Sequence, residues 1–244
     1  MVALNTPSSD EEEPTLTADM LEIYFSRDQE IWCSKRSDLA SSWSAPVPLI
    51  TGSFPYSHPS VSADGLLLLY SSDESAQYRE NINAMQRASR ADPWGEPAPV
   101  VELNTTEKEL AGGMTPDKRL LVLMRTEKSD FNLFLTTRGS AEAPWGTPQP
   151  IDALSSPGTE NRPWISPAAT VIYFDSDRPG AAMRDIFVSV RPDPAATWGP
   201  PAPLTSLNTS ADDSDVWLSP DLRTIYFSSD RNGGSMEIFV ATRQ

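Results

Sequence analysis

The residues of this chain that could carry chemistry are acidic side chains at equivalent positions of repeated segments. Two such positions lie eight and six residues before a recurring sequence marker whose first copy is Asp19. The first position holds Glu11, Tyr56, Glu109, Glu160 and Asp213. The second holds Glu13, His58, Ala111, Arg162 and Asp215. Gathered at one place, such side chains could bind a cation, hold a polar ligand, or act as acid and base in glycoside hydrolysis.

Signatures of other chemistries are missing from the sequence. His58 is the only histidine and cannot form a multi-histidine metal site, and Cys33 is the only cysteine, so no internal disulfide is expected. The sequence contains no Cys-x-x-Cys pair, glycine-rich phosphate loop or Gly-x-Ser-x-Gly motif. From the sequence alone we assign no catalytic residues. We expect no cofactor; the acidic positions would suit calcium as the alternative, and the identity of any metal stays open.

The elements that must position these residues repeat five times. The marker at Asp19 has counterparts at Asp64, Asp117, Ala168 and Asp221. Nine residues after each marker stand Asp28, Asp73, Thr126, Asp177 and Asp230. Each unit then ends an apolar run in an arginine, namely Arg36, Arg87, Arg138, Arg191 and Arg243. Seven residues after the first four arginines follow Trp43, Trp94, Trp145 and Trp198, spaced by 51, 51 and 53 residues.

Each unit predicts short β-strands. In the last unit, three apolar runs at 216–218, 224–228 and 238–242 are separated by Ser-Pro-Asp and Asn-Gly-Gly turn signals. Units of about 50 residues with four such strands bury their faces only by stacking in a ring. We therefore predict an all-β, five-bladed β-propeller of four-stranded antiparallel blades over residues 1–244. Its approximate blades are 7–50, 51–103, 104–154, 155–207, and 208–244 together with 1–6.

Several segments resemble the WD40-like (PD40) repeat of TolB-type propellers. They are Leu-Ser-Pro-Asp at 218–221, Ile-Tyr-Phe-Ser-Ser-Asp-Arg at 225–231 and Trp-Gly-Pro-Pro-Ala-Pro-Leu at 198–204. The resemblance covers nearly the whole chain and implies a propeller scaffold. It also implies a periplasmic or secreted protein, although such repeats serve many functions. Family members that bind other proteins make a protein or peptide partner the leading expectation.

The N-terminal residues are expected to close the ring. Leu4-Asn5-Thr6 repeats the Leu-Asn-Thr that follows the outer strand of two other units, at 103–105 and 207–209. The N-terminus should therefore supply the outer strand of the last blade. Residues equivalent to 198–203 do not precede it in this sequence, which is expected of a trimmed N-terminus or of a short closing strand.

Charge narrows the classes of partner. The chain has 19 Lys and Arg against 34 Asp and Glu, a net charge of −15, which repels phosphate backbones and anionic membranes. No apolar run is long enough to span a bilayer. We therefore expect no nucleic acid, no membrane insertion and a monomer, with a small molecule or an oligosaccharide as alternative ligands.

Loop lengths indicate which face binds. The first hairpin of each unit and the link between the third and fourth strands are uniform, whereas the second hairpin and the link between units vary in length. Both variable loops open on one face of a propeller, where the two acidic positions also lie. We predict a partner-binding channel mouth formed by Glu11, Glu13, Tyr56, His58, Glu109, Glu160, Arg162, Asp213 and Asp215. Three hypotheses stay open, namely a non-catalytic protein-binding module, a small-molecule or metal binder, and a glycoside hydrolase-like enzyme.

Overall fold

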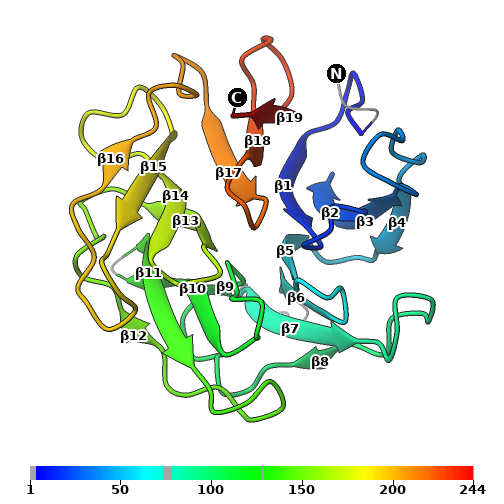
Figure 1. Cartoon of the computed structure of the whole chain (residues 1–244), viewed down its shortest axis with the longest axis horizontal. Helices are drawn as coiled ribbons and strands as arrows, with labels where there is room; N and C mark the ends of the chain where they lie inside the picture. Colours follow the sequence, from blue (N-terminus) through cyan, green and yellow to red (C-terminus); the bar gives the residue numbers. More distant parts are fainter. Residues whose placement is uncertain (1–3, 74–78, 128, 244) are drawn as a thin grey trace.

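The computed structural model describes residues 4–73, 79–127 and 129–243, and within them every regular element is a β-strand. The strands form five antiparallel sheets arranged in a ring, as the repeat predicts (Figure 1). The first two blades are β1 Glu11–Leu16, β2 Glu22–Arg27, β3 Glu30–Lys35, β4 Val47–Ile50, β5 Tyr56–Val61, β6 Leu67–Ser72, β7 Asn81–Gln86 and β8 Ala98–Pro99. The next two are β9 Glu109–Leu110, β10 Leu120–Glu127, β11 Asp130–Thr137, β12 Gln149–Pro150, β13 Glu160–Ile165, β14 Val171–Ser176, β15 Asp185–Val190 and β16 Ala202–Pro203. The fifth is β17 Asp213–Leu218, β18 Thr224–Ser229 and β19 Glu237–Thr242.

The first strand of each blade lines the centre of the ring, and the last lies at its periphery (Figure 1). The second strand of each blade is covered on both faces, as the all-buried pattern of β2 and β6 shows. Its β-branched, aromatic and leucine side chains suit this position because they pack against the neighbouring blades on either side. The resulting apolar clusters hold residues of adjacent blades together, for example Leu121, Val122 and Leu123 of β10 between two such clusters.

The repeated arginines and tryptophans of the first four units stack on one another. The guanidinium carbons of Arg36, Arg87, Arg138 and Arg191 lie 4.4, 4.4, 4.0 and 4.2 Å from the ring centroids of Trp43, Trp94, Trp145 and Trp198. Each arginine Nε also donates a hydrogen bond to the backbone carbonyl of a first-hairpin residue in the left-handed region. Arg87 also pairs with Glu22 of the preceding blade at 2.5 Å.

Replacing Arg138 with Ala should lower the free energy of unfolding by about 1–3 kcal/mol, because it removes a cation–π contact and a buried hydrogen bond. The lost contacts are those to Trp145 and to the carbonyl of Lys118 at 2.6 Å. Chemical denaturation measures the loss, with Arg119→Ala as the matched control because Arg119 is exposed on the same hairpin. A variant as stable as the control would show that the repeated arginine is dispensable.

The N-terminal segment closes the ring at the last blade. The side chain of Asn5 accepts a hydrogen bond from the Ile238 N–H at 2.9 Å and donates one to the Ile238 carbonyl at 3.0 Å. Asn104 and Asn208 bind Ile82 and Ile186 in the same way. Leu4 is completely buried in the cluster between the first and last blades. The part of the expected closing strand at residues 1–3 lies outside the described residues, and the described part of the fifth sheet has three strands.

The aspartates after each second strand do not all bind their own turn. Asp177 and Asp230 accept hydrogen bonds from the backbone N–H groups of Thr159 and Asp212, which precede the first strand of the same blade. These carboxylates therefore tie the loop between blades to the second hairpin, so both variable loops are held together on one face.

Candidate functional site

The first strands of four blades carry an irregularity that turns one side chain toward the centre of the ring. The pairing of β1 with β2 shifts between Glu12 and Thr15, and the same shift recurs in β5, β13 and β17. One residue at each shift has a positive φ, of 62°, 52°, 49° and 59° for Glu13, His58, Arg162 and Asp215. Such a conformation costs on the order of 1–3 kcal/mol for a residue with a Cβ and is concentrated at functional sites.

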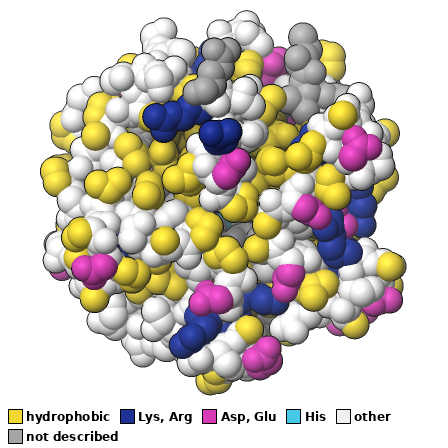
Figure 2. Space-filling model, in the orientation of Figure 1, with side chains coloured by type: hydrophobic (Ala, Val, Ile, Leu, Met, Phe, Trp, Pro, Cys, Tyr) yellow, Lys and Arg dark blue, Asp and Glu magenta, His cyan; other side chains and the backbone are white. Residues whose placement is uncertain are grey.

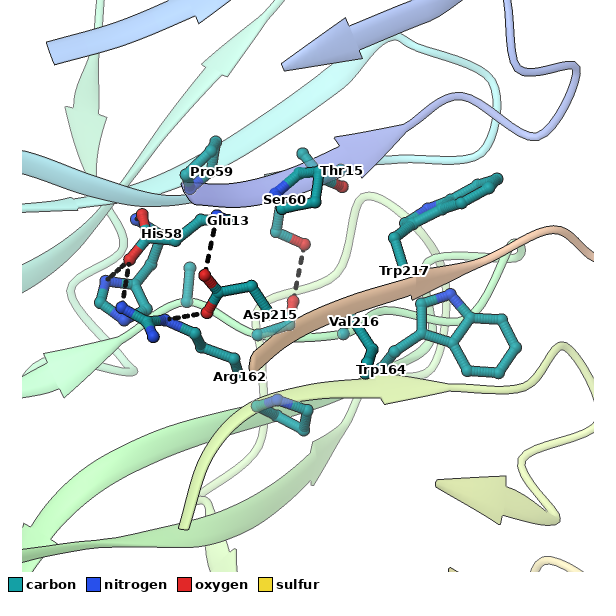
Figure 3. Close-up of a pocket in the computed structure, with 15 residues that line it drawn as sticks. Glu13, Thr15, His58, Pro59, Ser60, Arg162, Trp164, Asp215, Val216 and Trp217 are labelled. Atoms are coloured by element: carbon teal, nitrogen blue, oxygen red, sulfur yellow. Dashed lines mark hydrogen bonds and ion pairs between the residues drawn. The ribbon is translucent and has the colours of Figure 1, made fainter. Parts of the chain in front are cut away.

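These four side chains meet in one ion network across the channel. Glu13 Oε1 lies 3.3 Å from His58 Nδ1 and 3.1 Å from Arg162 Nη2. Arg162 Nε lies 2.6 Å from Asp215 Oδ1. Figure 3 shows Glu13, His58, Arg162 and Asp215 pointing toward one another, with Trp164 and Trp217 to one side.

Backbone groups tie the network to the blades. The N–H of Glu13 donates to Asp215 Oδ2 at 3.1 Å, and the N–H of His58 donates to Glu13 Oε2 at 2.5 Å. Each of these two carboxylates thus binds the first strand of the next blade as well as Arg162. The network therefore joins four of the five blades at the centre of the ring.

The third blade brings no charge to the network. Its equivalent residue is Ala111, whose N–H donates to the Ser71 hydroxyl at 2.9 Å. The next residue, Gly112, lies so close to β10 that a Cβ would come within 2.3 Å of the Val122 carbonyl. A larger residue is excluded there, and this side of the channel is lined by backbone.

The side chains that line the channel change from charged to apolar along its length. The network lines a small pocket of about 60 Å³ together with Pro59, Pro163, Trp164 and Trp217, among others. At the end where the first hairpins turn, the lining becomes apolar, with Leu16, Met114 and Leu218. Figure 2 shows hydrophobic side chains gathered around the centre of the face in view. The charged groups are therefore confined to the mouth on the variable-loop side.

The acidic residues eight positions before each marker do not lie at the channel mouth, which corrects the prediction that both acidic positions meet there. Glu11, Glu109, Glu160 and Asp213 are completely buried and do not line the channel pocket. Each pairs with an arginine near the end of the second strand of its own blade, at 2.8, 2.8, 3.1 and 2.5 Å. Each also accepts hydrogen bonds from the N–H and hydroxyl of a Thr or Ser in the preceding loop. These carboxylates hold the loops between blades.

A wider pocket opens at the mouth above the network, between the first two blades. It encloses about 560 Å³. Its lining is Asp10, Glu12, Glu13, Ser26, Asp28, Gln29, Pro55, Tyr56, Ser57, His58, Glu80 and Arg162. Burial lowers the pKa of His58, although Glu13 opposes this. The pocket therefore carries five carboxyl groups against one permanent positive charge.

Three further charged residues lie at this site that the sequence did not predict, namely Glu12, Asp175 and Arg184. Burial, followed by the charge of Asp215, raises the pKa of Glu12 to about 7. Burial also raises the pKa of Asp175 to about 6, although Arg162 opposes it. Arg184 pairs with Asp212 at 2.9 Å. A signal for Asp175 was available, because Tyr-Phe-Asp-Ser-Asp at 173–177 places Asp where the last unit has Ser228.

Within residues 4–73, 79–127 and 129–243, no cluster of three or more His, Cys, Asp or Glu side chains is arranged to hold a metal ion. The place between Glu13 and Asp215 that a cation would take is held by the Arg162 guanidinium. The same part of the chain contains no helix long and apolar enough to cross a membrane.

Replacing Glu12 with Gln should increase stability by about 3 kcal/mol at pH 8 and by only about 1 kcal/mol at pH 5. The raised pKa of Glu12 means that the native state keeps a proton that the unfolded chain releases near pH 4.5. Stability in the wild type is therefore lost as the pH rises from about 4.5 through 7, and the glutamine does not suffer this loss. Urea denaturation from pH 5 to 8 tests the slope, with Glu96→Gln as an exposed control. Parallel profiles for both variants would contradict it.

Comparison with known proteins supports the fold and no more. No protein-family model and no curated protein matches the chain. Among solved structures, it is similar over 99% of its length to 84% of a TolB-type protein from Agrobacterium tumefaciens, with 19% identity and a TM-score of 0.62. It is also similar to an endo-arabinase from Bacteroides thetaiotaomicron, with 14% identity, a TM-score of 0.71, and coverage of 100% and 98% of the two chains. A TolB from Acinetobacter baumannii matches at 15% identity with a TM-score of 0.59, over 96% of this chain and 52% of that one. The chain is a β-propeller whose structural neighbours include TolB propellers and glycoside hydrolases.

Proposed function

We propose that the protein is a non-catalytic scaffold that binds a protein or peptide on the face formed by the second hairpins and the loops between blades. The observation that carries this is the acidic mouth pocket above the ion network. Within the described residues, the side chain of Glu12 makes no hydrogen bond or ion pair, and Asp10, Asp28 and Glu80 lie on the same lining. Such a pocket suits a basic side chain of the partner, because a Lys or Arg supplies the missing positive charge.

The face fits recognition better than catalysis because its central charges are already paired. Glu13 and Asp215 are each bound to Arg162 and to a backbone N–H. Burial acts to raise the pKa of Glu13, but His58, Arg162 and the backbone N–H outweigh it, so the pKa is lowered and the group stays ionised. A general acid must hold a proton near neutral pH, which Glu13 does not.

Binding is tested with labelled hexapeptides of Gly and Ser that carry one Arg, one Lys or one Glu. We expect the basic peptides to bind and the acidic one to fail, and Glu12→Gln combined with Glu80→Gln to weaken binding at least tenfold. Glu96→Gln serves as the control because it lies outside the pocket. Equal binding of acidic and basic peptides, or binding that survives the double change, would refute the proposed site.

A second candidate function is glycoside hydrolysis, favoured by the raised pKa values of Glu12 and Asp175, whose carboxyl groups lie near that of Asp215. A protonated and an ionised carboxyl group are what this chemistry requires. Incubation with oligosaccharides, arabinan fragments included, decides between the two functions. Cleavage that disappears in Glu12→Gln and Asp215→Asn would establish the enzyme, whereas we expect no cleavage.

Two further expectations follow from this proposal. Calcium at millimolar concentration should leave the melting temperature unchanged, because Arg162 already balances the carboxylates. The TolB-like fold supports a periplasmic or secreted location, which fractionation of the producing cells would test.

A further inference from the structure

Among the five carboxyl groups that line the acidic mouth pocket, that of Glu12 differs from the others in its contacts. The other four each have a partner in the described chain, namely Asp10 the N–H of Met236, Glu13 the guanidinium of Arg162, Asp28 the hydroxyl of Ser9 and Glu80 the ammonium of Lys108. Within residues 4–73, 79–127 and 129–243, no group donates a hydrogen bond to the half-buried Glu12 side chain or forms an ion pair with it.

The charged groups around Glu12 come from several elements. Negative charge comes from Asp215 of β17 and Glu13 of β1, and positive charge from Arg162 of β13 and Arg184 in the loop before β15. Neither arginine is reserved for Glu12, because the first bridges two carboxylates of the ion network and the second pairs with another aspartate at 2.9 Å. The remaining titratable groups on the pocket lining are Asp10, Asp28, His58 and Glu80.

An ionised Glu12 therefore lacks a counter-charge of its own. Burial, followed by the charge of Asp215, raises the pKa of Glu12 to about 7. A proton removes the uncompensated charge, and a cationic side chain placed beside Glu12 would balance it. The two compete, because a protonated carboxyl group offers no charge to a cation. Binding of a cation and loss of the proton are thus thermodynamically linked.

We propose that the mouth pocket exchanges the proton of Glu12 for the basic side chain of its partner, so that the partner binds at pH 8 and is released as the pH falls toward 5.5. This inference rests on the proposed binding function and states how that same site is regulated. The sign follows from the ionised form being the one that binds a cation. Affinity is therefore complete above the pKa of Glu12 and declines below it.

The test uses the full chain and a labelled Gly and Ser hexapeptide with one Arg, blocked at both ends so that the arginine carries its charge. Fluorescence anisotropy at pH 8, 7, 6 and 5.5 gives the Kd, and thermal melts check that the chain stays folded at each pH. We expect the peptide to bind about 30-fold more weakly at pH 5.5 than at pH 8, because a carboxyl group with a pKa of about 7 is almost fully protonated at pH 5.5.

Three variants assign this pH dependence. Glu12→Gln should bind the peptide weakly at every pH and lose the slope. Glu80→Gln is the matched control within the pocket, since it should weaken binding but keep the slope. Glu96→Gln lies outside the pocket and should behave as the wild type.

Titration calorimetry at pH 6.5, in two buffers of different ionisation enthalpy, counts the protons exchanged on binding. We expect the wild type to release about 0.8 proton per bound peptide, the protonated fraction of a group with a pKa of about 7. Glu12→Gln should release almost none. This count on the wild type needs no variant, so it decides the matter even if Glu12→Gln does not fold.

The outcomes separate the exchange from the binding function on which it rests. Absence of binding at pH 8 would refute the binding function and the exchange together. Binding at pH 8 with the same Kd at pH 5.5, or binding without proton release, would overturn the exchange alone. A slope that persists in Glu12→Gln would also overturn it, and would assign the pH dependence to another group such as His58.

Discussion

Deleting residues 1–6 is expected to lower the free energy of unfolding by about 4 kcal/mol or more and to promote self-association. The deletion empties the site of Leu4, which is completely buried between the first and last blades. It also removes both hydrogen bonds of Asn5 to Ile238, and the two bonds that Thr6 donates to Glu11. Glu11 would then stay buried with fewer partners, which adds a desolvation cost.

Thermal melts and size-exclusion chromatography measure the two effects of this deletion. A point variant refines the result, because Leu4→Ala should cost about 2–5 kcal/mol while Leu39→Ala should cost little. Leu39 is a fair control since it is 57% exposed. If the shortened chain melts at the wild-type temperature and stays monomeric, the N-terminal segment does not close the ring.

Replacing Arg162 with Met is expected to destabilise the protein by about 3–5 kcal/mol at pH 7, because it leaves buried carboxylates without a counter-charge. Arg162 is the cation shared by Glu13 and Asp215. Burial acts to lower the pKa of Arg162, but the negative charges around it, that of Asp215 first, outweigh burial and raise it. Methionine preserves much of the side-chain volume, so the loss reports charge more than packing.

The pH dependence identifies the cause of this destabilisation. Without Arg162 the burial of Glu13 is opposed by one charge fewer, and its pKa should rise above that of the unfolded chain. The native state then holds extra protons at low pH, so the deficit should shrink toward pH 5 and grow toward pH 8. Asp215→Asn added to Arg162→Met should restore part of the stability, and Arg119→Met is the exposed control. A deficit that is constant from pH 5 to 8 would instead assign the loss to packing.

The repeat by itself determined the fold. Markers such as Asp19, Arg138 and Trp145 recur in fixed register because each blade needs the same hairpin, the same stacked guanidinium and the same indole between blades. The match of Leu4-Asn5-Thr6 to two later segments placed the N-terminus on the last blade, and the Asn5 hydrogen bonds show why that match exists. These features are local or repeated, so one sequence is sufficient to expose them.

The site was only half predictable. Glu11 and Glu13 are two residues apart, and in a regular strand both would face the same way. The shift in pairing beside Glu13 and its left-handed backbone break this alternation, so Glu13 turns into the channel while Glu11 binds Arg27 in its own blade. The prolines that follow Glu13, His58 and Arg162 were a signal for this irregularity, since proline inside a strand commonly marks a bulge or an edge.

The sequence alone therefore determined the number of blades, their shared scaffold residues and the closure of the ring, because each is encoded in every repeat. Only the tertiary structure decided which carboxylates meet. Glu13, His58, Arg162 and Asp215 come from four different blades, and no spacing along the chain states that their side chains share one ion network. Long-range packing determines which side chains of different blades come into contact, whereas the repeat determines only which side chains each blade carries.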